Sequence, residues 1–113
     1  MSDIVYKCVD ILGDDISSMK ATGKAEVKYR IGEFVEAPEW LAEQGYHLLV
    51  FDNIYDARNM LCDIFKAEAE EEMPLPPRLF SNELENGLIE ACTLPWPRGT
   101  KMYKRVKLLE QII

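Results

Sequence analysis

Residues 53–72 read NIYDARNMLCDIFKAEAEEE, and the architecture of the whole chain depends on how they fold. Apolar side chains recur along this segment at the three- and four-residue spacing that lines one face of a helix. These side chains are Ile54, Ala57, Leu61, Ile64 and Phe65. Asp52 or Asn53 can cap the first turn, and Ala67–Glu72 is rich in residues of high helix propensity. The segment therefore predicts one long helix over 53–72.

The same segment allows a second reading. In that reading the helix ends near Cys62, and Ile64–Glu70 form a strand. We favour the long helix. The choice matters because it decides whether the glutamates at the end of the segment share one face.

Strand signals lie on both sides of this segment. Runs of β-branched and aromatic residues, or alternation of apolar and polar residues, predict strands over 4–11, 16–22, 25–35, 46–51, 88–93 and 100–109. Gly32 breaks the run over 25–35, either as a turn or as a bulge. A short helix is predicted over 37–45, where Pro38 suits the first turn and Gly45 the C-terminal stop. Ser81–Asn86 is predicted to form a helical turn. We therefore predict a single α+β domain, residues 1–113, with a mostly antiparallel sheet, one long central helix and one short helix.

The composition narrows the class of protein. The 113 residues are 48% hydrophobic, which is enough for one core. No run approaches the ~20 apolar residues of a membrane helix, and the N-terminus lacks the features of a signal peptide, so we expect a cytoplasmic protein. Cys8, Cys62 and Cys92 show no CxxC spacing, and His47 is the only histidine, so we expect free thiols and no metal site. The phosphate-binding glycine loops are absent, and no cofactor is expected.

The net charge of −7 is unevenly distributed. Residues 36–75 carry ten acidic and two basic residues, whereas residues 76–113 carry four acidic and six basic ones. The middle of the chain would repel phosphates and anionic lipids, so we do not expect a membrane or a nucleic acid as its partner. It would attract a protein with a basic surface.

The glutamates at the end of the decisive segment are the first candidate binding site. Glu68, Glu70, Glu71 and Glu72 form a charge run at the C-terminal end of the predicted helix, where acids are slightly unfavourable with the helix dipole. A solvated helix end is the ordinary explanation, and an acidic surface that meets a basic partner is the functional one. Trp40 and Trp96 each lie next to proline, and tryptophan in a rigid turn can anchor an interface. We predict these six residues as partner-binding.

Two other classes of function stay open. Basic residues near the C-terminus, with Tyr103 and Trp96 among them, could bind nucleic acid, although a strand would divide them between two faces. They are Arg98, Lys101, Lys104, Arg105 and Lys107. A small enzyme could use His47 with a carboxylate such as Asp52, but no nucleophile-elbow pattern surrounds the serines or threonines. No catalytic residue is therefore predicted.

Two groups of short motifs resemble a known class of domains. They are Tyr29-Arg30-Ile31-Gly32-Glu33 with Ala37-Pro38, Leu49-Val50-Phe51-Asp52 and Ala57, and Pro97-Arg98-Gly99-Thr100 with Val106-Lys107-Leu108. Together they resemble small uncharacterised domains encoded by bacteriophages and prophages. The resemblance implies a phage or mobile-element origin and carries no catalytic residues. Small acidic phage proteins often bind and block host machinery, including CRISPR effectors, so we expect a protein-binding module that inhibits a host nuclease or defence complex. A structural or assembly role in a virion, which would show as homo-oligomerisation, also stays open.

Overall fold

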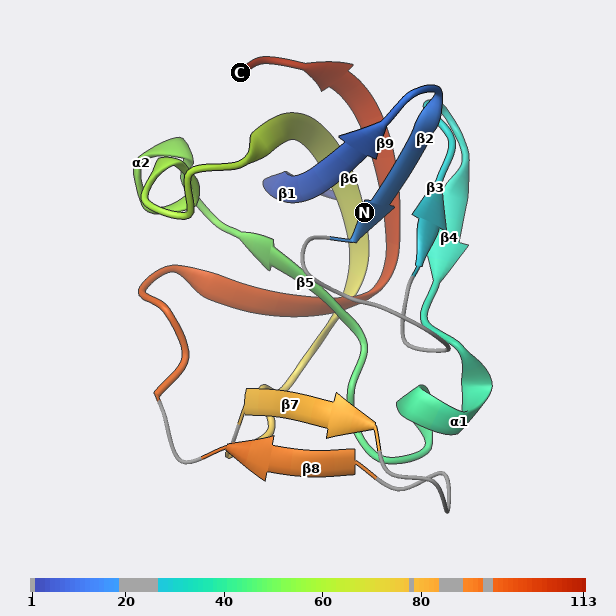
Figure 1. Ribbon diagram of the computed structural model, residues 1–113, viewed down its shortest axis with the longest axis vertical. Helices are drawn as coiled ribbons and strands as arrows, with labels where there is room; N and C mark the ends of the chain where they lie inside the picture. Colours follow the sequence, from blue (N-terminus) through green and yellow to red (C-terminus); the bar gives the residue numbers. More distant parts are fainter. Residues whose placement is uncertain (1, 19–26, 78, 84–88, 93–94) are drawn as a thin grey trace.

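The computed structural model describes residues 2–18, 27–77, 79–83, 89–92 and 95–113 (Figure 1). Strands make up most of these residues, and neither of their two helices exceeds five residues. The elements are β1 (Asp3–Leu12), β2 (Asp15–Ser18), β3 (Lys28–Tyr29), β4 (Phe34–Glu36), α1 (Glu39–Ala42), β5 (Leu48–Phe51), α2 (Ile54–Arg58), β6 (Asp63–Met73), β7 (Leu79–Glu83), β8 (Ile89–Cys92) and β9 (Thr100–Gln111). Within the described ranges, both helices are far too short to cross a bilayer.

The prediction of an α+β domain with a long central helix over 53–72 was wrong. The segment forms the single turn of α2, and then the long strand β6. In β6 the buried residues Phe65, Ala67 and Ala69 alternate with partly exposed polar ones, which is the period of a half-buried strand. Because β6 pairs along its length with β1 and with β9, backbone pairing on both edges outweighs the helix propensity of its alanines and glutamates.

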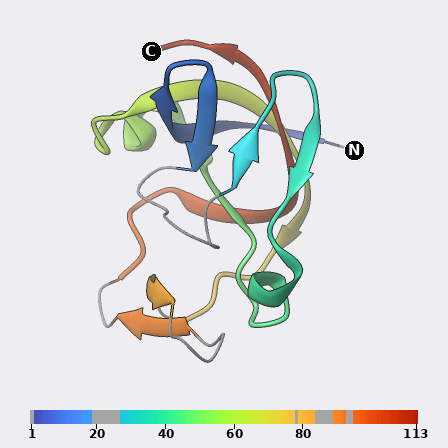
Figure 2. The ribbon, with the colours of Figure 1, turned by 45° about the vertical axis from the view of Figure 1, so that its right-hand side comes forward.

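The long strands form a small barrel-like sheet in which all pairs are antiparallel. β6 pairs with β1 on one edge and β9 on the other, and β5 bridges β1 and β9 from the opposite side, so these four strands close into a ring. β2 and β3 extend the sheet from β1, and β4 extends it from β9. Figure 2 shows β6 and β9 curving together along one side, with the separate β7–β8 pair below.

The core lies inside this closed sheet, and a second cluster lies outside it. The inner residues come from every strand of the larger sheet: Val5, Val9, Ile16, Val27, Tyr29, Val35, Leu48, Val50, Phe65, Ala67, Ala69, Tyr103, Val106 and Leu108. On the outer side, α2 places Ala57 over Cys8, Phe51 and Ile64. The short helix therefore covers one face of the sheet and is held there by apolar packing.

The structure confirms some of the other predicted elements and corrects the rest. The predicted strands 4–11, 46–51 and 100–109 and the helix 37–45 appear as β1, β5, β9 and α1, with shifted ends. The predicted strand 88–93 appears as β8, and its first and last positions fall outside the described residues. The predicted break at Gly32 takes the form of a turn, with a φ of 86° that favours glycine, and it divides the run over 25–35 into β3 and β4. Positions 25 and 26 fall outside the described residues. The predicted strand 16–22 begins as β2, and its second half falls outside the described residues. The helical turn predicted from Ser81 was wrong, because residues 81–83 belong to β7, which pairs with β8; residues 84–86 fall outside the described residues.

Candidate functional site

The predicted acidic and basic sites lie side by side and bind each other. The register of β6 and β9 sets Glu68 opposite Lys107 and Glu70 opposite Arg105. We call the resulting group of ion pairs the charge ladder; it comprises Glu36, Glu68, Glu70, Glu71, Glu72, Lys101, Lys104, Arg105 and Lys107. The oxygen–nitrogen distances include 3.3 Å for Glu68–Lys107, 3.6 Å for Glu70–Arg105 and 3.6 Å for Glu72–Lys101.

Arg105 is the centre of the charge ladder. Its guanidinium contacts Glu71, Glu70 and Glu36, so it joins three strands. The hydrogen bond to Glu71, with the other two carboxylates, raises the pKa of Arg105 and keeps it charged. Lys107 also lies over the ring of Phe34, with its Nζ atom 4.7 Å from the ring centre.

The charge ladder is nearly neutral, because its five acids face four bases. A basic protein would compete with these bases for the glutamates, and a nucleic acid would compete with the glutamates for the bases. Arg98 is exposed and takes no part in the charge ladder. Binding of an external partner at either cluster stays a prediction, and the structure gives each of them an internal partner instead.

The two tryptophans and the histidine lie apart from the charge ladder. Trp96 is half-buried and its Nε1 atom donates a hydrogen bond to the Pro76 carbonyl over 2.6 Å, which fixes the ring against a loop. Trp40 lies half-buried on α1. His47 and Asp52 flank the two ends of β5, five residues apart along an extended strand, which is about 16 Å. The structure therefore does not bring His47 and Asp52 together as an acid–base pair.

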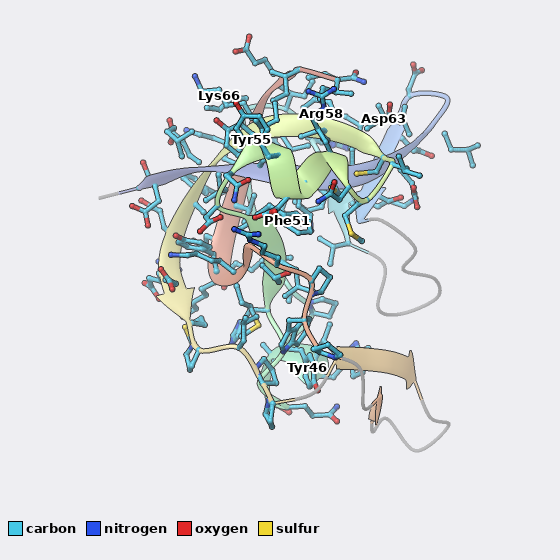
Figure 3. All side chains as sticks on the ribbon, turned by 90° about the vertical axis from the view of Figure 1, so that its left-hand side faces the viewer. Tyr46, Phe51, Tyr55, Arg58, Asp63 and Lys66 are labelled. Carbon is cyan, nitrogen blue, oxygen red and sulfur yellow. The ribbon has the colours of Figure 1, made fainter. Side chains whose placement is uncertain are left out.

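Two strongly exposed large apolar side chains lie on and just after α2, in the segment that was predicted to be a continuous helix. Tyr55 is 75% exposed and Leu61 is 94% exposed, and Arg58 between them is exposed as well. We call these three residues the α2 knob. Figure 3 shows Tyr55 and Arg58 on α2, with Asp63 and Lys66 of β6 beside the helix. The apolar spacing that predicted the helix placed Leu61 in its buried stripe, so no sequence pattern indicates that Leu61 is exposed.

Hydrogen bonds and a glycine hold the α2 knob in place. Asn53 caps α2 by accepting a hydrogen bond from the Asp56 backbone nitrogen over 2.9 Å, and its own Nδ2 atom donates to Asp56 Oδ2 over 2.7 Å. Asp56 in turn packs against Gly99, at the turn before β9. The Asp52 nitrogen donates to the Gly99 carbonyl over 3.0 Å. The start of α2 is therefore fixed to the start of β9.

Lys7 is a buried charged residue that the sequence analysis did not single out. It lies on β1 between the inward-facing Val5 and Val9 and is only 6% exposed. Its Nζ atom donates a hydrogen bond to the Leu49 carbonyl over 2.6 Å and lies 5.6 Å from the ring centre of Tyr29. Burial lowers the pKa of Lys7 to about 8, partly offset by the neighbouring thiols Cys8 and Cys62.

The groups around Lys7 are neutral. Tyr29 is 4% exposed, and its hydroxyl has no hydrogen-bond partner in the part of the chain that the structure describes. Burial raises the pKa of Tyr29. The Cys8 thiol donates to the Ala57 carbonyl over 3.5 Å, and burial raises the pKa of Cys8 and of Cys62. Both thiols are therefore protonated at neutral pH and are poor nucleophiles.

Comparison of the chain with protein-family models, with curated proteins and with solved structures finds no significant match. The resemblance to phage-encoded domains therefore stays a prediction. Among the described residues, histidine, cysteine, aspartate and glutamate side chains form no group of three or more that could hold a metal ion.

Proposed function

We propose that the chain is a protein-binding module that contacts its partner through the α2 knob. The observation that carries this proposal is Leu61, which is 94% exposed and has a backbone φ of 54°. That left-handed conformation costs a residue with a side chain about 1–2 kcal/mol. The chain thus holds a large apolar side chain outward in a strained conformation, and binding a partner gives such an arrangement a use.

The other two members of the α2 knob support the same proposal. Tyrosine and arginine are among the residues that contribute most to binding energy at protein interfaces. Tyr55 and Arg58 lie three positions apart, so they project from the same face of the helix. Because the cap at Asn53 and the packing of Ala57 already fix α2, the three side chains lose little backbone freedom on binding.

The partner is a protein that offers an apolar recess for Leu61 and Tyr55, with a carboxylate for Arg58 at its rim. A component of a host nuclease or defence complex is the class of partner implied by the resemblance to phage domains. The charge ladder takes no direct part in this contact. It stabilises the sheet that carries α2.

The test is quantitative capture of proteins from a host lysate by the tagged full-length chain, after nuclease treatment. We expect one partner to be recovered in stoichiometric amount, and we expect Leu61→Gly to reduce its recovery at least tenfold, about 1.4 kcal/mol. Glycine relieves the strain at φ 54°, so the variant should be as stable as the parent or more stable by up to about 1 kcal/mol. Loss of binding without loss of stability separates a contact role from a structural one.

The matched control is Leu12→Gly, which removes an exposed leucine (83%) from the β1–β2 hairpin, away from α2. This variant should capture the partner as well as the parent does. Recovery that is unchanged in Leu61→Gly, or reduced equally in both variants, would argue against the α2 knob. If recovery is instead lost when Glu70 and Glu72 are changed to lysine, the partner binds the glutamates of β6 rather than the α2 knob.

A further inference from the structure

Lys7 has the surroundings of a reactive amine rather than those of a structural lysine. A buried lysine that serves the fold is ordinarily paired with a carboxylate, because an unpaired buried charge is costly. Among the described residues, no carboxylate acts on Lys7; the charged or titratable groups around it are Tyr29 on β3, Cys8 on its own strand and Cys62 before β6. Across the strands, Lys7 is paired with Phe65 of β6 and donates to the Leu49 carbonyl.

Tyr29 supplies a second, independent observation. Its hydroxyl is buried inside the sheet and finds no hydrogen-bond partner among the described residues, which is unfavourable unless a ligand or water supplies one. The same burial keeps the phenol protonated and favours the neutral form of the amine. A hydroxyl that stays protonated and can donate a hydrogen bond therefore lies beside an amine that can act as a nucleophile, with the Lys7 Nζ atom 5.6 Å from the centre of the Tyr29 ring.

We infer that Lys7 binds small aldehydes covalently, as an imine inside the barrel-like sheet, with the Tyr29 hydroxyl as the proton donor. The Nζ lone pair attacks the carbonyl carbon, the carbon–nitrogen bond forms, and the carbonyl oxygen takes the phenol proton. The nitrogen returns a proton to Tyr29, and the phenol passes it to the hydroxyl, which leaves as water. The second proton of the nitrogen then restores the phenol, and the imine remains. No oxidant or reductant is needed. This chemistry is independent of the α2 knob and of any protein partner.

Neutral amine is the reactive form, and Lys7 holds more of it than an ordinary lysine does. A pKa of about 8 leaves about 10% of the amine neutral at pH 7, roughly 300-fold more than at the ordinary value of 10.5. Labelling at Lys7 should therefore rise about tenfold per pH unit below pH 8 and level off above it.

The experiment treats the folded full-length chain with acetaldehyde and sodium cyanoborohydride, which reduces the imine to an ethylamine. Peptide mapping by mass spectrometry then reads the rate at each of the eight lysines. At pH 7 we expect Lys7 to be labelled at least tenfold faster than Lys66, which lies partly exposed on the outer side of β6. Lys7→Met should abolish that adduct and leave the rate at Lys66 unchanged.

Tyr29→Phe removes a hydroxyl that makes no hydrogen bond with the described residues, so this variant should melt at the parent's temperature or above it. We expect it to label at Lys7 at least tenfold more slowly while keeping the inflection near pH 8, which a merely structural tyrosine would not produce. Labelling at Lys7 no faster than at Lys66, or only after the chain is unfolded in denaturant, would overturn the inference. An unchanged rate in Tyr29→Phe would remove Tyr29 from it.

Discussion

Replacing Gly99 by alanine is expected to lower the free energy of unfolding by about 2–4 kcal/mol. Gly99 has a φ of 81°, where any side chain is strained, and an added Cβ atom would lie 2.4 Å from Asp56 Oδ2 and 3.0 Å from Asp56 Cβ. Asp56 has little freedom to move away, because Asn53 holds its carboxylate and its backbone nitrogen. The substitution therefore either separates the start of β9 from α2 or breaks the cap.

The matched control is Gly13→Ala, because Gly13 also has a positive φ (64°) but an added Cβ atom would meet nothing within 4 Å. Gly13→Ala therefore measures only the cost of placing a side chain at a positive φ, which is about 1 kcal/mol. Chemical denaturation of both variants gives the two losses. If Gly99→Ala costs no more than Gly13→Ala, the close approach of Asp56 to Gly99 is not a feature of the folded chain.

Ala67→Glu should prevent folding or cost at least ~3 kcal/mol. Ala67 is fully buried on β6, paired with Val5 of β1 and Leu108 of β9. A carboxylate there would enter the closed core without a partner. The measurement is the denaturation midpoint, or the loss of dispersed amide signals in the NMR spectrum if the variant does not fold.

The control for Ala67→Glu is Lys66→Glu, which introduces the same residue one position earlier, on the outer side of β6. It should cost less than about 1 kcal/mol. If residues 53–72 formed a helix, position 67 would lie off the apolar stripe, and Ala67→Glu would cost little stability. Tolerance of Ala67→Glu would therefore contradict the strand.

The sequence was sufficient where local pattern and final environment agree. The β-branched run of β1, the compact apolar run of β5 and the proline–glycine boundaries of α1 predicted those elements correctly. The prediction was wrong over 53–72, because the segment fits both the helical period of 3.6 residues and the strand period of 2 residues. Ala57, Leu61 and Phe65 fit a helix, whereas Phe65, Ala67 and Ala69 fit a strand. Pairing with β1 and β9 decides between the two, and neither strand lies near this segment in the sequence.

For the candidate sites too, the sequence predicts the local features but not those that depend on pairing between distant strands. The acidic and basic runs were evident in the sequence, but only the register of β6 with β9 shows that they neutralise each other. The alternation of Val5, Lys7 and Val9 does place a lysine on an apolar strand face, and that signal could have identified Lys7. No sequence pattern identifies the orphaned hydroxyl of Tyr29 or the exposure of Leu61, because both depend on how distant strands pack.

The central claim is that the glutamates of β6 pair with the basic residues of β9. A double-mutant cycle on Glu68 and Lys107 tests this pairing most directly. The two side chains are 30% and 26% exposed and 3.3 Å apart. Glu68→Lys and Lys107→Glu should each lower the free energy of unfolding, because each places like charges opposite one another. The exchanged double variant should recover, giving a coupling of about 0.5–1 kcal/mol that shrinks in high salt. A coupling of zero, or losses that simply add, would show that these charges do not meet in the folded chain and that the acidic strand is free for an external partner.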